Sequence, residues 1–256
     1  MPGDALAAYR LRDGRGLEPC PQTLAIAAWL AENRGAPIVT PDPSTAPVLV
    51  FDFSTSSTEW AADALSGPML ASEEIERRMR EAAAEVGVGR YDEVRGVYTA
   101  AQFQTAGEAR TVHLGLDLFQ PAGVPVFAPL GGTVHSFADN ALPLDYGPTV
   151  ILEHRPDGCP PFWTLYGHLS RASLRGLAEG DSVEAGQRIG ALGTPEENGG
   201  WAPHLHVQLI TDLLGRRGDF PGVGTAEERS VWTSLCPDPN LLLRIPASAF
   251  HGARSS

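Results

Sequence analysis

The spacing of apolar and polar residues changes near residue 110 of this chain. Before that point, residues 22–33 predict a short amphipathic or buried helix, and residues 47–54 are a run of β-formers that predicts a strand. Residues 72–87 give the clearest helical pattern, with Ser72 as a cap and Gly87 as a stop. Beyond residue 110, short apolar runs separated by Gly and Pro recur at intervals of about ten residues, which is typical of an antiparallel β-sandwich or open barrel.

This change in the spacing of apolar residues divides the chain into two parts. We expect a small α/β or linker region over residues 1–105, and a mostly β domain over residues 106–256 that closes with an irregular C-terminal extension. The first part contains no cluster of residues that suggests chemistry. Its expected role is therefore to support or connect the second part.

Composition narrows the range of partners and chemistries. The formal charge of −12 disfavours nucleic acid and anionic membranes as partners, because both attract basic surfaces. All 19 basic residues are arginine, which excludes a lysine nucleophile or Schiff base from this chain. The three scattered cysteines favour a reducing compartment. Residues 1–19 lack a signal-peptide pattern, and no apolar run reaches the roughly 18 residues of a membrane helix. We expect a cytoplasmic protein, or an extracytoplasmic one if the sequence is a fragment.

The stretch HLGLDL, residues 113–118, gives the first candidate chemistry. If it forms one strand, His113, Gly115 and Asp117 lie on one face and the leucines lie on the other. Gly115 leaves space between the imidazole and the carboxylate. This pattern predicts a polar site rather than a solvent-exposed face.

Two further stretches repeat this design. In TLYGHL, alternation places Tyr166 and His168 on one face, and in HLHVQL it places His204 and His206 on one face. We therefore predict one cleft lined by His113, Asp117, His168, His204 and His206.

Two imidazoles and one carboxylate are the protein ligands of many catalytic zinc ions, and the fourth position is left to water. The ion activates that water and polarises a carbonyl, while the remaining imidazoles transfer protons or stabilise an oxyanion. The residues thus predict a hydrolase. The same ligand set also occurs in non-haem iron enzymes, a reading that leaves two histidines without a role. Spacing alone does not decide which of His204 and His206 is the ligand.

Six motifs in a fixed order carry a specific resemblance. They are HLGLD (113–117), APLGGTV (128–134), YGPTVILEH (146–154), YGHL (166–169), GDSVEAGQRIG (180–190) and PHLH (203–206). In this order and spacing, residues 110–210 resemble the catalytic domain of the lysostaphin/LytM-type zinc metallopeptidases, which cut peptide cross-links in bacterial cell walls. The resemblance implies a small, mostly antiparallel β domain with its site in an open groove.

The resemblance also implies a role for each residue. One Zn²⁺ would be held by His113, Asp117 and His206. His168 and His204 would be the catalytic pair, one the base for the metal-bound water and the other the stabiliser of the oxyanion, in an order that the resemblance does not assign. The implied activity is hydrolysis of peptide or amide bonds.

Departures from the family pattern bear on the substrate. The Ser/Thr-Gly that commonly precedes PHLH is replaced by Trp201 and Ala202, and the segments 138–147 and 195–200 are lengthened. Tyr166 and Trp201 are the candidate groove residues, although Trp201 would serve equally well as a loop anchor. With no wall-binding module, a peptide or small amino-acid conjugate is the expected substrate rather than peptidoglycan.

A weaker resemblance concerns the setting of the domain. Similar domains occur in cytoplasmic fusions between kinase-like and aminotransferase-like enzymes, so such domains are possible partners. The alternative function is a non-catalytic LytM-like binding or regulatory module, as in relatives that have lost ligands.

Overall fold

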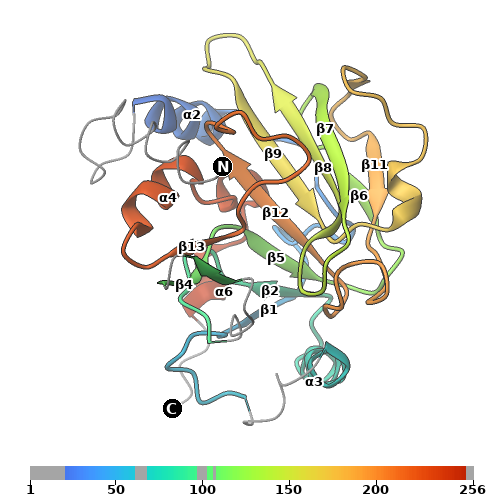
Figure 1. The fold of residues 1–256 in the computed structure, drawn as a ribbon. Coiled ribbons are helices and arrows are strands. Elements are labelled where there is room, and N and C mark those ends of the chain that lie inside the picture. The colour runs from blue at the N-terminus through green and yellow to red at the C-terminus, as the bar shows by residue number, and fades with distance from the viewer. Residues whose placement is uncertain (1–20, 61–67, 97–102, 106–107, 252–256) are drawn as a thin grey trace.

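The computed structural model describes residues 21–60, 68–96, 103–105 and 108–251 (Figure 1). The N-terminal stretch considered for a signal peptide, together with Cys20, lies outside these ranges. None of the helices within the described ranges is long and apolar enough to cross a membrane.

An eight-stranded sheet organises the molecule, in the order β1-β2-β5-β12-β9-β8-β7-β10 (Figure 1). Its strands are β1 (Val48–Phe51), β2 (Val86–Gly89), β5 (Leu116–Phe119), β7 (Gly132–Asn140), β8 (Gly147–His154), β9 (Phe162–Gly167), β10 (Ser182–Val183) and β12 (His204–Ile210). Only the pair β1–β2 is parallel in this sheet. The mostly β fold class is confirmed, with a mixed sheet in place of a purely antiparallel one.

Two smaller sheets flank the large one. The first pairs β6 (Pro125–Phe127) with β11 (Arg188–Ala191), and the second joins β3 (Gln104–Thr105), β4 (Glu108–His113) and β13 (Val223–Thr225). A single turn of 3₁₀ helix, η2 (Arg171–Leu174), follows β9.

The N-terminal part of the chain contributes two strands to the large sheet. β2 pairs with β5, so that Gly87 lies opposite Phe119 and Gly89 lies opposite Asp117. The predicted segments 1–105 and 106–256 therefore share one sheet, and residues of the first segment stand directly beside a candidate site residue of the second.

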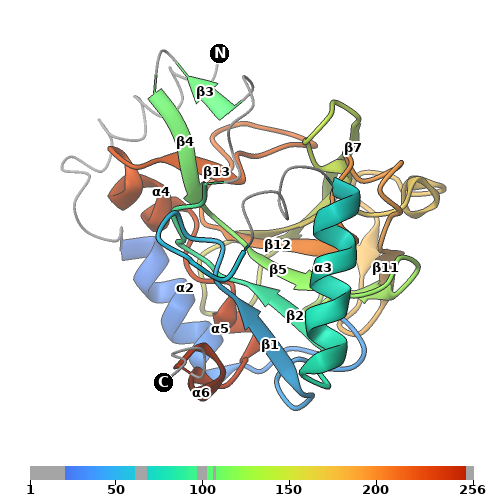
Figure 2. The same cartoon turned by 90° about the horizontal axis from the view of Figure 1, so that it is seen from below.

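The helices depart in part from the sequence patterns. Helix α2 (Pro21–Glu32) and strand β1 form where they are predicted. Helix α3 (Pro68–Glu81) begins before Ser72 and ends well before Gly87, which lies within β2 alongside the helix in Figure 2. The reason is packing. A Cβ on Gly87 would lie 2.7 Å from the Phe51 ring and 3.0 Å from the Phe119 Cβ, so this glycine allows close packing in the sheet rather than a helix stop.

The C-terminal segment is not irregular, contrary to the prediction. It contains α4 (Arg229–Leu235), α5 (Asn240–Leu243) and α6 (Ala247–His251). Val231, Trp232 and Leu235 are buried, a spacing that places them on one face of α4. Burial of that face stabilises a helix too short to form by itself.

One face of the large sheet packs in the main core, and the other carries polar side chains of β12. Leu205, Val207 and Leu209 of β12 point into the main core, which α2 and α5 cover. Residues His204, His206 and Gln208 alternate with them and therefore point to the other face. The candidate site lies on that second face.

Candidate metal centre

The stretch HLGLDL does not form one strand, in contrast to the prediction. β4 ends at His113, β5 begins at Leu116, and the two strands belong to different sheets. The chain can bend here because Gly115 carries no side chain, and a Cβ on it would lie 2.5 Å from two atoms of the His206 ring. The bend still brings His113 and Asp117 together, with 3.2 Å between His113 Nε2 and Asp117 Oδ1.

Strand pairing places His206 at the centre of the site. It lies opposite Asp117 of β5 on one side and opposite Gly167 of β9 on the other. Paired residues point to the same face of a sheet, so the Asp117 carboxylate and the His206 imidazole emerge side by side. The absence of a side chain at Gly167 leaves room for the Tyr146 ring, which a Cβ there would meet at 2.6 Å.

Tyr166 and His168 do not share a face, in contrast to the prediction. β9 ends at Gly167, and His168 adopts a left-handed backbone with φ of 64°, which interrupts the alternation. His168 consequently turns toward the site. Tyr166 is fully buried in the main core, where its hydroxyl hydrogen-bonds to Thr164. Tyr166 is therefore a core residue and does not line a substrate groove.

Three side chains point potential metal-ligand atoms toward one another. His113 Nε2 lies 3.1 Å from His206 Nδ1, and Asp117 Oδ1 lies 3.2 Å and 3.3 Å from these two nitrogens. All three side chains are buried, and one ligand atom from each lies within 4.8 Å of the others. These are His113, Asp117 and His206, the three residues that the family resemblance implies as ligands.

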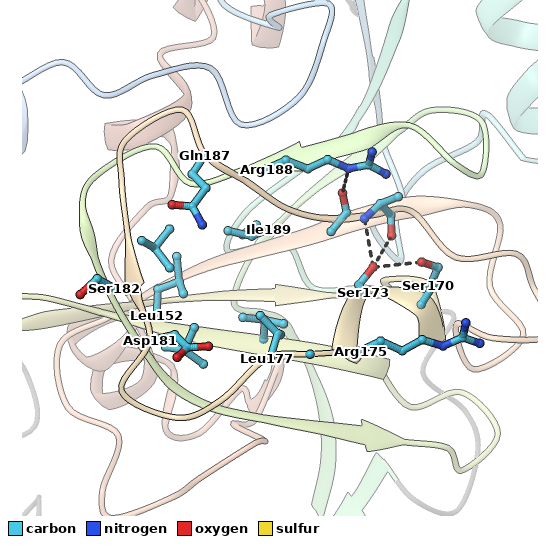
Figure 3. Close-up of a pocket in the computed structure, with 17 residues that line it drawn as sticks. Leu152, Ser170, Ser173, Arg175, Leu177, Asp181, Ser182, Gln187, Arg188 and Ile189 are labelled. Carbon is cyan, nitrogen blue, oxygen red and sulfur yellow. Dashed lines mark hydrogen bonds between the residues drawn. The ribbon is translucent and has the colours of Figure 1, made fainter.

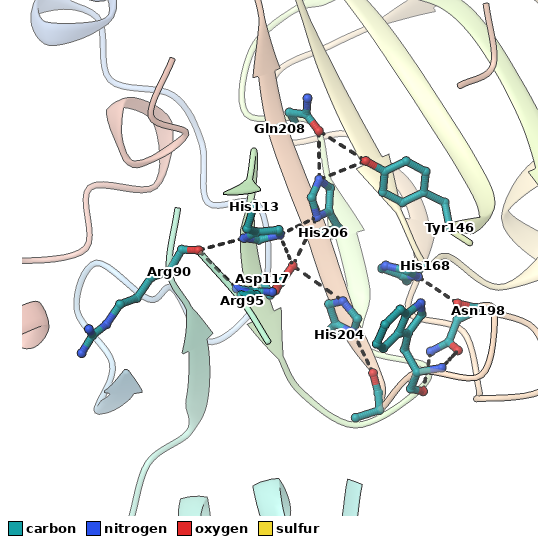
Figure 4. A network of polar contacts seen from close by, with 12 residues as sticks. Arg90, Arg95, His113, Asp117, Tyr146, His168, Asn198, His204, His206 and Gln208 are labelled. Carbon is teal, nitrogen blue, oxygen red and sulfur yellow. Dashed lines mark hydrogen bonds and ion pairs between the residues drawn. The ribbon is translucent and has the colours of Figure 1, made fainter. Parts of the chain in front are cut away.

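Carbonyl oxygens fix the proton positions on the surrounding imidazoles (Figure 4). His113 Nδ1 donates to the Arg90 carbonyl at 2.8 Å, and His206 Nε2 donates to Gln208 Oε1 at 3.0 Å. A carbonyl only accepts, so these nitrogens carry the protons and His113 Nε2 and His206 Nδ1 are left as lone pairs. Two lone pairs and a carboxylate oxygen thus face one another in a buried space.

Such an arrangement suits a cation. Three acceptors at 3.1–3.3 Å without a proton between them repel one another unless a positive charge lies among them. Tetrahedral coordination with zinc–ligand bonds near 2.0–2.1 Å separates ligand atoms by about 3.3 Å. The residues present therefore fit a metal ion in donor type and in spacing.

The Asp117 carboxylate is held in its charged form. Burial alone would raise its pKa, but the adjacent His113, Arg95 and His204 together lower the pKa well below its usual range. Burial, assisted by the charge of Arg95, lowers the pKa of His113 to about 4, so that its ring is neutral and able to bind metal.

The other two predicted histidines stand beside this group. His204 Nδ1 donates to the Ala202 carbonyl at 2.7 Å, and its Nε2 lies 3.6 Å from Asp117 Oδ1. His168 Nδ1 donates to the Asn198 carbonyl at 2.9 Å, and the His168 and His204 ring centres are 4.2 Å apart. Burial lowers the pKa of both rings, which keeps them neutral with one nitrogen free to accept a proton.

The side chains that form the site are buried. The side chains of His113, Asp117, His168, His204 and His206 belong to residues that are only 1–6% exposed. Trp201 stands next to His168, with ring centres 6.4 Å apart, and packs with Phe103 and Leu144 in a small apolar cluster. Residues outside the motifs thus pack beside the His168 ring.

Sequence reasoning missed four residues that support the site: Arg95, Tyr146, Asn198 and Gln208. Gln208 continues the alternation of HLHVQ, so the same-face pattern could have identified it. Asn198 accepts backbone hydrogen bonds from Gly200 and Trp201 and shapes the loop before β12. Tyr146 begins the motif YGPTVILEH, which could have pointed to it, whereas no local pattern connects Arg95 to the site.

A cavity of about 510 Å³ lies elsewhere, beside β7, β8, β11 and η2 (Figure 3). Its floor is apolar and includes Leu152 and Ile189, while Arg175 and Arg188 stand at its rim. None of the five predicted metal-ligand and catalytic residues lines it.

A buried cluster of two imidazoles and a carboxylate, with two further neutral imidazoles at its side, is an arrangement found in many metal-dependent hydrolases. The family comparison makes this more specific, because residues 111–216 match the model of Peptidase family M23. Residues 111–216 are therefore similar to M23 peptidases, in agreement with the resemblance of their motifs.

One curated relative is similar to part of the chain. An uncharacterized metalloprotease of Haemophilus influenzae is 34% identical over 97 residues, which are 38% of this chain. The matched part spans only 18% of that relative's length.

Solved structures give matches of the same kind. The catalytic domain of lysostaphin from Staphylococcus simulans is 26% identical, with 57% of this chain and 86% of that one covered and a TM-score of 0.36. A zinc-containing peptidase from Vibrio cholerae is 27% identical, with 41% and 28% covered and a TM-score of 0.32.

Proposed function

We propose that this chain is a zinc-dependent hydrolase of peptide or amide bonds, in which His113, Asp117 and His206 hold the ion. The observation that carries the proposal is a cluster of three potential metal-ligand atoms that carry no proton and lie 3.1–3.3 Å from one another. The M23 match over residues 111–216 supports the peptidase chemistry. The zinc that the Vibrio cholerae peptidase contains supports the choice of metal.

His168 and His204 would act on the reacting groups. Zinc bound in such a site lowers the pKa of a water molecule and polarises a carbonyl. The Nε2 of His204 faces the cluster without a proton, because its Nδ1 donates to Ala202. It can therefore accept a proton from the attacking water. His168 is held in the same way by Asn198. One of the two rings would serve as base and then pass the proton it has accepted to the leaving amine, while the other would stabilise the oxyanion.

The substrate we propose is a short peptide or a small amino-acid conjugate. The burial of the five side chains supports this choice, since a cross-linked polymer needs an open groove. Trp201 and the cluster around Phe103 are the parts of the wall that would limit substrate length.

The test combines metal content with turnover. Wild-type protein should bind one zinc ion and hydrolyse members of a library of short peptides and acylated amino acids, detected by mass spectrometry. His113→Ala and Asp117→Ala should lose both zinc and turnover. His168→Ala and His204→Ala should keep zinc and lose turnover. Zinc retained in both His113→Ala and Asp117→Ala would contradict the ligand assignment.

A second candidate is a non-catalytic module with a bound metal ion. The observation that favours it is the same burial of the site, because structural metal sites are closed while catalytic sites keep an open position. A wild-type protein that holds zinc but hydrolyses nothing in the library, with or without His168→Ala, would favour this candidate over the hydrolase.

A further inference from the structure

Arg95 connects the N-terminal part of the chain to the metal centre. It follows β2 and lies before residue 111, outside the segment that matches the M23 family. Its Nη1 donates to Asp117 Oδ2 at 2.7 Å, and its Nη2 donates at 3.2 Å to the Arg90 carbonyl, which also receives the His113 Nδ1 proton. One guanidinium thus contacts one ligand directly and the partner of a second ligand (Figure 4).

We propose that Arg95 is a positioning residue of the metal centre, which fixes Asp117 as a ligand through one oxygen and steadies the carbonyl that orients His113. This inference rests on the proposed function. It assigns to the N-terminal part of the chain a task in metal binding that the family match does not cover.

The two oxygens of Asp117 are divided between two tasks. Oδ2 accepts from Arg95, while Oδ1 faces His113 Nε2 and His206 Nδ1 at 3.2 and 3.3 Å. Without Arg95 the carboxylate could rotate or present both oxygens to the ion. Partners of this kind orient metal ligands and tune metal affinity.

A cation beside a divalent ion requires compensation, and Glu93 provides it. Its Oε2 accepts from Arg95 Nε at 2.9 Å, and its Oε1 accepts from the Phe53 backbone N–H at 3.1 Å. The pair Glu93–Arg95 therefore presents hydrogen-bond donors to the centre without adding net charge. Both side chains are buried, where an unpaired arginine would be strongly unfavourable.

Packing leaves the guanidinium little freedom. It lies over the Phe53 ring, 5.1 Å from the ring centre, and it uses space that Gly89 leaves open. A Cβ on Gly89 would lie 2.8 Å from both Arg95 Nη2 and Asp117 Oδ2. The residue paired with Asp117 across β2 and β5 is thus a glycine at the point where the guanidinium must pass.

The experiment measures zinc affinity by competition with a chromophoric chelator. Arg95→Met should weaken zinc binding by about 10–100-fold, the usual effect of removing a partner of a metal ligand. Arg95→Lys should recover part of the affinity, because one ammonium can reach Asp117 or the Arg90 carbonyl but lacks the planar fork that serves both. Arg77→Met is the matched control, since it removes an arginine that pairs with Glu74 and Glu81 on α3.

A second readout separates positioning from a merely structural role. In the cobalt-substituted protein, a released Asp117 can bind through both oxygens, which raises the coordination number and weakens the visible absorption per bound ion. We expect this change in Arg95→Met and not in Arg77→Met. If Arg95→Met fails to fold, Arg95→Lys and Glu93→Gln should show the same change to a smaller degree.

The outcomes distinguish the two proposals. Suppose that the wild-type protein binds zinc and that the folded Arg95 variants have the same zinc affinity and the same cobalt spectrum. This result would overturn the positioning role of Arg95 and leave the proposed hydrolase function untouched. A wild-type chain that binds neither zinc nor cobalt would overturn both.

Discussion

Gly115 offers a sharp test of the packing around the metal centre. In Gly115→Ala, the new methyl group would lie 2.5 Å from Cε1 and Nε2 of His206 and 2.7 Å from the Val207 carbonyl oxygen. Ordinary contact begins near 3.4 Å, so either the ring or the start of β5 must move by the difference, about 0.9 Å. The Val207 carbonyl belongs to the central strand β12, which is paired on both sides and cannot retreat.

The magnitude follows from these contacts. Overpacking of a well-ordered interior costs about 1–3 kcal/mol. Displacement of the His206 ring also breaks its 3.0 Å hydrogen bond to Gln208, which adds about 1 kcal/mol. We therefore expect Gly115→Ala to lower the free energy of unfolding by about 2–4 kcal/mol, and the melting temperature by roughly 10 °C for a chain of this size. Zinc affinity should fall by at least about 10-fold, because a ligand itself is displaced.

Urea denaturation of the zinc-free protein and chelator competition measure the two effects separately. Gly131→Ala is the matched control, since a Cβ there meets nothing closer than the Val183 carbonyl oxygen at 3.6 Å. Gly131→Ala should stay close to wild type in both measurements. Wild-type stability together with wild-type zinc affinity in Gly115→Ala would refute the tight contact between Gly115 and His206.

Three further changes test other parts of the structure. Gln208→Leu should weaken zinc binding about 10–100-fold in the chelator assay, because the proton on His206 Nε2 loses its acceptor; an unchanged affinity would contradict this role. Asn198→Ala should lower the free energy of unfolding by about 1–2 kcal/mol in urea, because the part-buried Trp201 N–H and carbonyl both lose their side-chain partner, and it should reduce turnover with zinc retained; equal turnover would show that the loop does not orient His168. Burial lowers the pKa of His154 in the folded chain. Below pH ~6.5 the unfolded chain therefore binds a proton that the folded chain does not, and stability falls as pH falls. His154→Gln should reduce this slope by up to about 1.4 kcal/mol per pH unit, measured by urea denaturation between pH 6.5 and 5; the same slope in both proteins would contradict a neutral His154.

Local patterns in the sequence predicted much of the fold. The alternation in HLHVQL describes β12 correctly, since His204 and His206 leave the core face that Leu205 and Val207 occupy. The apolar runs beyond residue 110 form the strands of a mostly β domain, and α2 forms where its pattern lies. These features depend on near neighbours, so a single sequence carries them.

Features that depend on distant contacts were not predictable in this way. The positive φ of His168 and the break between His113 and Leu116 interrupt the alternation of side chains that the sequence predicts. The packing beside His168 depends on Phe103 and Trp201 meeting across many residues of sequence. Arg95 reaches Asp117 only because β2 pairs with β5, a register that no local motif specifies.

The position of β2 next to β5 has a practical consequence for anyone who trims the chain to residues 111–216. In such a fragment β5 would be an exposed edge strand. Its backbone groups that now pair with β2 could then pair with a strand of another molecule. Leu116 and Leu118, now in the core, would stand at that edge. Cutting at the homology boundary should therefore produce aggregates, while fragments that begin ahead of β1 should stay dispersed.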